Sequence, residues 1–251
     1  MVGEFIFIIF LILLAFLGFK LLRGVLKLAM FGLIILAVLL MIGTLAIVID
    51  TRNLQKNLPE GDLLFLLEQD GRIEAGFASK GISGQNVSFL NSSVMEPIVN
   101  AYARGDLASA TDGYYRVFIL QPKVFEPVSD LLQSQNKAYT KQFLLDVLQA
   151  DDPLGVYVQE QFGDKSAEFQ AQAKQALGDH ALLKSQLFAL LFQKLYDEKG
   201  LLYIFVQFKQ GNVAVEPESA MFKVIKKLPT SYAKGKVEAI LLAAKSKIAE
   251  G

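Results

Sequence analysis

Two serine–lysine pairs have the spacing that acyl-transferring enzymes use. They are Ser134 with Lys137 and Ser231 with Lys234. On a helix this spacing brings the hydroxyl near the amine, which can then activate it as a nucleophile. The companion motifs Ser-Asp-Asn and Lys-Thr-Gly are both missing from the sequence. Ser231 also follows Pro229, where a helix cap is the more usual role. We therefore expect no catalytic residue in either pair.

His180 is the single histidine of the chain and directly follows Asp179, so a carboxylate could orient it as a general base. A lone histidine in the first turn of a helix is more often structural. Asp151-Asp152-Pro153 could bind a cation, but a polar loop is the simpler interpretation because no further acids follow at a ligand spacing. With one histidine and no cysteine, a His-rich or Cys-based metal site within one chain is excluded. Gly81-Ile-Ser-Gly84 lacks the full G-x-G-x-x-G pattern, and we expect no cofactor.

The C-terminal part of the chain is strongly basic. Seven lysines against one glutamate, Glu238, give a net charge of plus six between Ser219 and Lys247. A solvated face with cations near helix C-termini would explain the pattern. The functional alternative is contact with an anionic surface: lipid head groups, nucleic acid or an acidic partner. Without interleaved aromatic residues, nucleic acid is not predicted. The candidate contact residues are Lys223, Lys226, Lys227, Lys234, Lys236, Lys245 and Lys247.

Two apolar blocks open the sequence, Phe5–Phe19 and Leu28–Ile49. Three basic residues separate them: Lys20, Arg23 and Lys27. The second block has no charge and no proline and is long enough to cross a bilayer as a helix. The first block is long enough only when it extends over residues 2–22 with Lys20 snorkelling to the interface. We predict a membrane anchor at residues 1–50, a helical hairpin of spans 2–22 and 28–49. The alternatives are an interfacial first helix, or a secretory signal, for which a basic n-region and a cleavage site are missing.

The three basic residues between the blocks predict a cytoplasmic loop by the positive-inside rule. The protein would then be integral to the cell membrane, with its C-terminal domain extracytoplasmic. Two glycosylation sequons, at Asn86 and Asn91, agree with this orientation. Arg52 and Lys56 oppose it, because they flank the second block on its other side. The basic C-terminal residues oppose it as well: if they faced lipids of the cytoplasmic leaflet, the domain would lie inside and the orientation would be reversed.

The remainder is predicted as a neck at 51–61 and an α+β globular domain at 62–251, with about five strands. The predicted strands are Leu63–Gln69, Arg72–Ala78, Tyr114–Leu120, Leu201–Lys209 and Val213–Val215. The first is apolar throughout, which predicts cover on both faces, whereas the second alternates as a half-buried strand does. Asp70-Gly71 predicts a type I′ turn and hence a first β-hairpin. Gln210-Gly211-Asn212 would form the turn of a second hairpin. The two hairpins look loosely alike, so a duplicated unit stays open as an alternative.

Helices are predicted from apolar stripes and cap residues. Ser93 and Glu96 resemble a capping box for a helix that runs to about Arg104. Asp179 is placed to cap a central, mostly buried helix over Ala181–Lys199, which Gly200 would end. The other predicted helices are Lys137–Gln149, Asp164–Leu177, Ser219–Leu228 and Ser231–Ala249.

These patterns together predict a membrane-anchored, non-catalytic binding or assembly module. Its partners would be the lipid bilayer and either another protein or further copies of this chain. The alternative is a membrane-associated hydrolase whose carboxylates come together only on folding. A transport subunit is not favoured, because neither apolar block contains an acid or a histidine.

Overall fold

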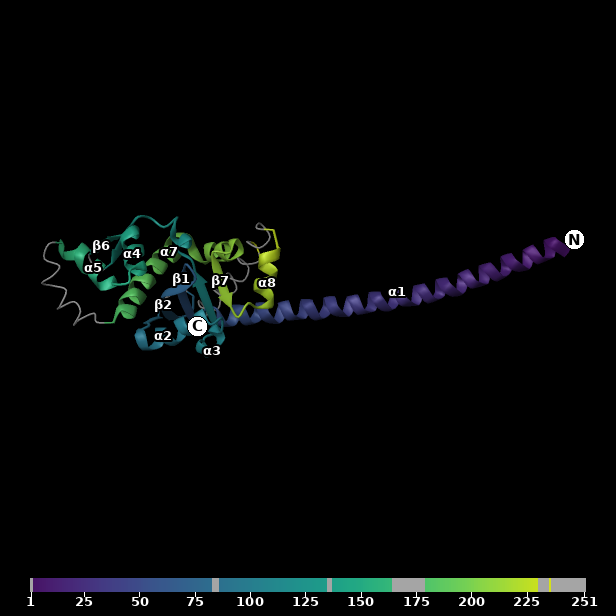
Figure 1. Ribbon diagram of the computed structural model, residues 1–251, viewed down its shortest axis with the longest axis horizontal. Helices are drawn as coiled ribbons and strands as arrows, with labels where there is room; N and C mark the ends of the chain where they lie inside the picture. Colours follow the sequence, from purple (N-terminus) through teal and green to yellow (C-terminus); the bar gives the residue numbers. More distant parts are fainter. Residues whose placement is uncertain (1, 83–85, 135–136, 164–178, 230–234, 236–251) are drawn as a thin grey trace, which may run out of the picture. The chain divides into compact units, whose positions relative to one another are not determined.

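The computed structural model describes residues 2–82, 86–134, 137–163, 179–229 and 235 (Figure 1). The chain forms two compact units, Met1–Ile49 and Asp50–Gly251. The described part contains seven α-helices, a five-stranded sheet and a separate two-stranded hairpin. The prediction of an α+β protein is therefore confirmed.

The N-terminal apolar residues form one helix rather than a helical hairpin. Helix α1 runs without a break over Val2–Asn57, so the predicted loop between two spans is wrong. Its residues explain the continuity: Lys20, Arg23 and Lys27 are good helix formers, and a single glycine costs only about 1 kcal/mol in a helix. No proline or turn dipeptide interrupts the sequence there.

One stretch of the described helix, Met30–Asn57, is long and apolar enough to cross a membrane by length and composition. Nearly every side chain from Met30 to Ile49 is exposed, and the exposed residues include Leu36, Leu40 and Leu45. A continuous apolar surface of this size normally requires cover by lipid or protein.

The five-stranded sheet is mixed, and its strand order is β3-β2-β1-β4-β7. The strands are β1 (Asp62–Gln69), β2 (Arg72–Lys80), β3 (Asn86–Phe89), β4 (Arg116–Leu120) and β7 (Val213–Glu216). Strands β1 and β4 are parallel, while the other pairs are antiparallel. We call the end of the sheet at Asp62, Arg116 and Glu216 the proximal end, and the end at Gln69, Leu120 and Val213 the distal end.

The first hairpin has the predicted turn, because Asp70 and Gly71 both adopt positive φ angles, 50° and 80°. The alternation predicted for β2 fails at one point. Leu67 pairs with Ala75 while Glu68 pairs with Ile73, so Glu74 is an extra residue in a β-bulge. The bulge moves Ile73 to the opposite face of the sheet from Phe77.

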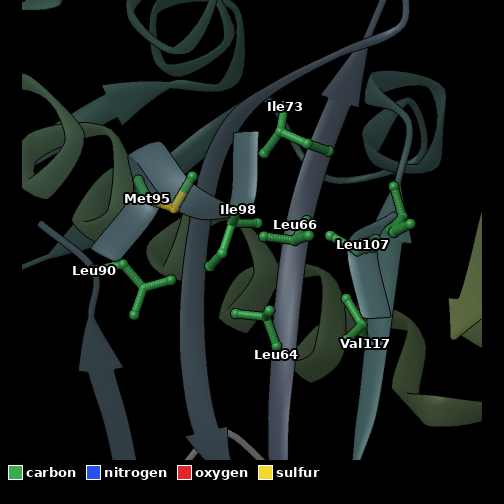
Figure 2. Close-up of a cluster of buried hydrophobic side chains, with 9 residues drawn as sticks. Leu64, Leu66, Ile73, Leu90, Met95, Ile98, Leu107 and Val117 are labelled. Carbon is green, nitrogen blue, oxygen red and sulfur yellow. The ribbon is translucent and has the colours of Figure 1, made fainter. Parts of the chain in front are cut away.

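Helices α2 (Ser92–Ala103) and α3 (Leu107–Ala110) cover one face of the sheet. Figure 2 shows the buried cluster between them and strands β1, β2 and β4. Its labelled members are Leu64, Leu66, Ile73, Leu90, Met95, Ile98, Leu107 and Val117. Helix α2 begins earlier than the predicted capping box requires: Asn91 rather than Ser93 is the N-cap, and its side chain accepts from the backbone N–H of Val94.

Helix α7 (His180–Gln210) covers the other face with aromatic side chains. The Phe65 ring of β1 lies 4.4 Å from Phe192 and 4.9 Å from Phe77, centroid to centroid. Since Leu64 and Leu66 point to the α2 side, β1 is buried on both faces, as its continuous apolar sequence predicts.

The predicted strand Leu201–Lys209 is wrong, because these residues continue α7. Gly200 is not helical, with φ 70° and ψ 175°, so the predicted end of the first helical segment at Gly200 is confirmed, and a second helical segment follows across the kink. Beyond the bend, Leu201, Ile204, Phe205 and Phe208 are buried, which is a helical spacing. Only Val213–Glu216 of the second predicted hairpin is a strand, so the suggested duplication is wrong as well.

The remaining elements are η1 (Pro122–Phe125), β5 (Leu131–Ser134), β6 (Lys137–Thr140), α4 (Lys141–Gln149), α5 (Pro153–Phe162) and α8 (Ala220–Lys227). The predicted helix Lys137–Gln149 is thus a strand for its first four residues, and Thr140 caps the helix that follows. The buried stripe predicted within it is confirmed. The predicted helices Asp164–Leu177 and Ser231–Ala249 lie outside the described residues, apart from Gly235, which is helical.

Candidate functional site

The last two turns of α1 belong to the globular unit. Leu54 and Leu58 are each only 1% exposed, within the stretch for which the sequence predicts a polar neck. The Leu58 carbonyl accepts a hydrogen bond from Ile82 N–H at 3.1 Å. A Cβ on Gly81 would lie 1.9 Å from the Pro59 carbonyl oxygen, so only glycine permits this approach. The end of the apolar helix is therefore built into the domain.

Asp50, the first residue after the apolar block, connects α1 to two distant parts of the sequence. Its Oδ2 accepts a hydrogen bond from the Met221 N–H at 2.7 Å, at the start of α8. Its Oδ1 lies 3.7 Å from Nη2 of Arg116, at the start of β4. A carboxylate at a helix N-terminus is favourable, because it meets unpaired N–H groups and the positive end of the helix dipole. Asp50 thus fixes α8 at the proximal end.

Arg116 is 8% exposed and makes contacts on more than one side. Its Nη1 donates to the Tyr115 carbonyl at 2.8 Å, and its guanidinium lies 4.4 Å from the centre of the Tyr115 ring. Burial is the main reason that the pKa of Tyr115 is raised, while the charge of Arg116 partly opposes the rise. The phenol is therefore neutral at physiological pH, and Asp50 supplies the negative charge that Arg116 requires.

Helix α8 presents an apolar face to the domain and a basic face to solvent. Met221, Phe222 and Ile225 are buried, and the Phe222 ring lies 5.1 Å from Phe208 of α7. Lys223 and Lys227, one turn apart, are exposed.

Lys226 is also exposed, but it pairs with Glu218 at 2.7 Å and lies 4.9 Å from the Phe208 ring. The structure thus places three of the seven predicted contact lysines together on one short helix. The other four, Lys234, Lys236, Lys245 and Lys247, lie outside the described residues.

Two further cations, Arg52 and Lys56, are exposed on the last turns of α1. The sequence shows them only as charges beside the apolar block. Their relation to α8 depends on the hydrogen bond between Asp50 and Met221, whose residues are 171 positions apart. No local pattern could reveal it.

The predicted His180–Asp179 pair takes another form. Asp179 caps α7 by accepting from Leu182 N–H, and its carboxylate also accepts from the backbone N–H and hydroxyl of Ser92, at 2.8 and 2.7 Å. Burial favours a higher pKa for Asp179, but these hydrogen bonds outweigh it and hold the pKa below its ordinary value. The carboxylate is therefore a structural link between α2 and α7.

His180 instead approaches Asp152, with Nε2 3.9 Å from Oδ1. Asp152 in turn caps α5 through Gly155 N–H. Two candidates from the sequence are thus neighbours in space, although both side chains are well exposed, at 45% and 62%. The Ser92 hydroxyl donates to Asp179 and not to His180, which is the wrong order for a serine nucleophile activated by histidine.

Ser134 and Lys137 lie opposite each other in the β5–β6 hairpin, so the helical geometry that a Ser-x-x-Lys nucleophile needs is not formed. Ser231 and Lys234 lie outside the described residues. Within the part of the chain that the structure describes, no group of three or more His, Asp or Glu side chains is placed to hold a metal ion.

One carboxylate remote from the sheet's proximal end is strongly perturbed. Glu198 of α7 accepts from the Ser129 hydroxyl and from the Ser129 N–H, the latter at 3.0 Å, and pairs with Lys194 at 3.2 Å. The Ser129 hydroxyl is the main reason that the pKa of Glu198 falls from its ordinary value of 4.5 to about 2. The contact joins the segment before β5 to α7, which again indicates a structural role.

The fold and these contacts define a class: an α+β domain carried on a long N-terminal apolar helix whose end is part of the domain. Comparisons with protein-family models, with curated proteins and with solved structures gave no match.

Proposed function

We propose that this protein is a membrane-anchored, non-catalytic module that holds its α+β domain at the bilayer surface for binding or assembly. The observation that carries the proposal is the set of contacts by which the end of α1, from Asp50 onward, packs into the domain. Asp50 directly follows the apolar block, its carboxylate caps α8 and faces Arg116, and Leu54 and Leu58 belong to the core. A flexible tether would need none of these contacts.

The apolar helix supplies the anchor in this proposal. Residues 30–49 expose an apolar surface along nearly their whole length, and a helix satisfies its own backbone hydrogen bonds in lipid. Three basic residues precede this stretch, whereas two, Arg52 and Lys56, follow it. By the positive-inside rule the N-terminal side is cytoplasmic, and the domain is extracytoplasmic.

The partner in this proposal is a protein, either another chain or a second copy. One support is that these carboxylates have structural roles: Asp179 and Asp152 cap helices, and Glu198 joins two segments of the domain. The exposed side chains include large apolar ones, among them Phe89 and Leu131, at 46% and 57%. Such residues are suited to contact with another protein.

The membrane part is tested by alkaline carbonate extraction of the full chain. We expect the wild-type protein in the pellet. Arginine at both Leu36 and Leu40 should move it to the supernatant, because each arginine costs about 3 kcal/mol at the centre of a span. Leu131→Arg is the matched control: Leu131 is 57% exposed and Leu36 is 54% exposed, but Leu131 lies in the domain. Wild-type protein in the supernatant would refute the anchor.

The binding part is tested on the carbonate-resistant fraction. After mild detergent extraction, chemical cross-linking and size-exclusion chromatography should give a species larger than the monomer. Recovery of monomer alone, with no partner and no self-association, would count decisively against an assembly module. Protease protection of the domain in sealed, oriented vesicles tests its side of the membrane separately.

A further inference from the structure

We infer that the exposed face of α8, through Lys223 and Lys227, contacts anionic lipid head groups of the bilayer that holds the anchor. This inference rests on the proposed membrane anchor but not on the proposed side of the membrane, because it requires only anionic lipid in the leaflet that faces the domain, whichever leaflet that is. It gives a function to two of the seven lysines that the C-terminal sequence suggests as contacts for an anionic surface.

The first step is the position of α8 within the globular unit. Its first N–H groups lie at Asp50, since Met221 N–H donates to Oδ2 at 2.7 Å, and Thr51 Oγ1 lies 3.6 Å from Met221 Sδ. Strand β7 leads to the same place, because its last residue, Glu216, pairs with Val117 at the proximal end. The start of α8 and Asp50 are therefore neighbours within the globular unit.

The second step is distance along the two helices. Lys223 and Lys227 follow Met221 by two and six residues, which correspond to about 3 and 9 Å of helix rise. Arg52 and Lys56 follow Asp50 by the same two and six residues. All four side chains are exposed. They therefore begin within two helical turns of the residue at which the apolar block ends.

The third step is charge. Helix α8 contains three lysines and no acid, and Lys226 is already paired with Glu218. Exposed acids do occur at the proximal end, at Glu60, Asp62 and Glu216, but they lie on the loop and strand ends and not on α8. Basic residues close to a bilayer are attracted to anionic lipids, and this attraction falls off within a Debye length. A lysine face next to the end of a span meets this condition.

The test uses the full chain in nanodiscs of phosphatidylcholine alone or with about 30% phosphatidylglycerol. Acylation of lysines by an amine-reactive ester is followed by peptide mass spectrometry. We expect Lys223 and Lys227 to react about fivefold more slowly in the anionic nanodiscs, and about 0.5 M salt should remove the difference. Lys123 is the internal control, because it follows β4 at the distal end and is exposed.

A charge reversal gives a second readout. Lys223→Glu should abolish the protection of Lys227 in anionic nanodiscs, whereas Lys123→Glu should leave it unchanged. Equal labelling of Lys223 and Lys227 in the two kinds of nanodisc would overturn the inference. Protection by duplex DNA in neutral nanodiscs, without protection by anionic lipid, would also overturn it. Failure of the chain to enter nanodiscs at all would instead refute the proposed anchor.

Discussion

Replacement of Leu54 by alanine tests whether the end of α1 is a part of the domain core. Leu54 is 1% exposed, although it lies only five residues beyond the apolar block. If α1 ended in a flexible stalk, this side chain would contribute nothing to the stability of the domain. In the structure it is buried, so its truncation must leave a cavity.

The expected cost follows from the atoms removed. Leucine to alanine deletes three carbon atoms, roughly 2.4 kcal/mol at about 0.8 kcal/mol each. The cavity left behind adds to this transfer cost, which gives a loss of about 3 kcal/mol in the free energy of unfolding. With a slope of about 2 kcal/mol per M urea, the midpoint should fall by about 1.5 M.

Urea unfolding of the full chain in detergent micelles measures this loss. All eight tyrosines lie beyond Asp50, so near-UV circular dichroism of tyrosine reports on the globular unit alone. Leu45→Ala is the matched control in the same helix, because Leu45 is 60% exposed, and its stability should stay within about 0.5 kcal/mol of wild type. Identical urea midpoints for Leu54→Ala and Leu45→Ala would refute the claim that the end of α1 is part of the domain core.

Three further changes test other contacts. Asp50→Asn removes the charge that faces Arg116, which is 8% exposed, and should lower the free energy of unfolding by about 2 kcal/mol, measured with urea. The value is modest because the two ions stand 3.7 Å apart. A wild-type urea midpoint would show that the pair contributes nothing. Ser129→Ala should raise the pKa of Glu198 from about 2 toward 4.5 in a carboxyl NMR titration. Because the native pKa is depressed, the stabilising effect of this contact is complete above pH 4.5 and is lost as the pH falls toward 2; an unshifted titration in the variant would contradict this. Gly200→Ala should lower the free energy of unfolding by about 2 kcal/mol, because φ 70° with ψ 175° is almost restricted to glycine. An unchanged urea midpoint would show that this backbone conformation is not needed.

Local chemistry made part of the fold predictable. Asp70-Gly71 specifies its own turn, and the apolar run of β1 correctly indicates cover on both faces. The apolar stripe in α4 and the helix predicted over Ser219–Leu228 are equally local, and both are confirmed.

Tertiary context decided the remaining elements. Leu201–Lys209 combines β-favouring residues with a helical stripe, and in the structure it forms a second helical segment after the kink at Gly200. The β-bulge at Glu74 depends on its partner strand and has no signal in its own sequence. In α1, the charges between the apolar blocks resemble a loop, although every one of them is compatible with a helix.

For the candidate site, the sequence predicted which residue types occur but not where they lie in the fold. The lysines of α8 are visible as a basic cluster, but their position depends on Asp50, which is 171 residues away from Met221 in the sequence. In the same way, Asp152 approaches His180 only after folding, and the adjacent Asp179 is used as a helix cap. Neighbours in sequence were thus a poor guide to neighbours in the site.

Hydrogen exchange of the full chain in nanodiscs, with increasing urea, tests the central claim most directly. Amides of residues 54–58 should exchange with the same free energy as those of β1, because both would open only when the domain unfolds. Amides of residues 30–49 should stay protected after the domain has unfolded, because lipid shields them. The account would be contradicted by either of two results. Residues 54–58 could exchange as readily as the exposed turn at Asp70-Gly71, or residues 30–49 could exchange together with the domain.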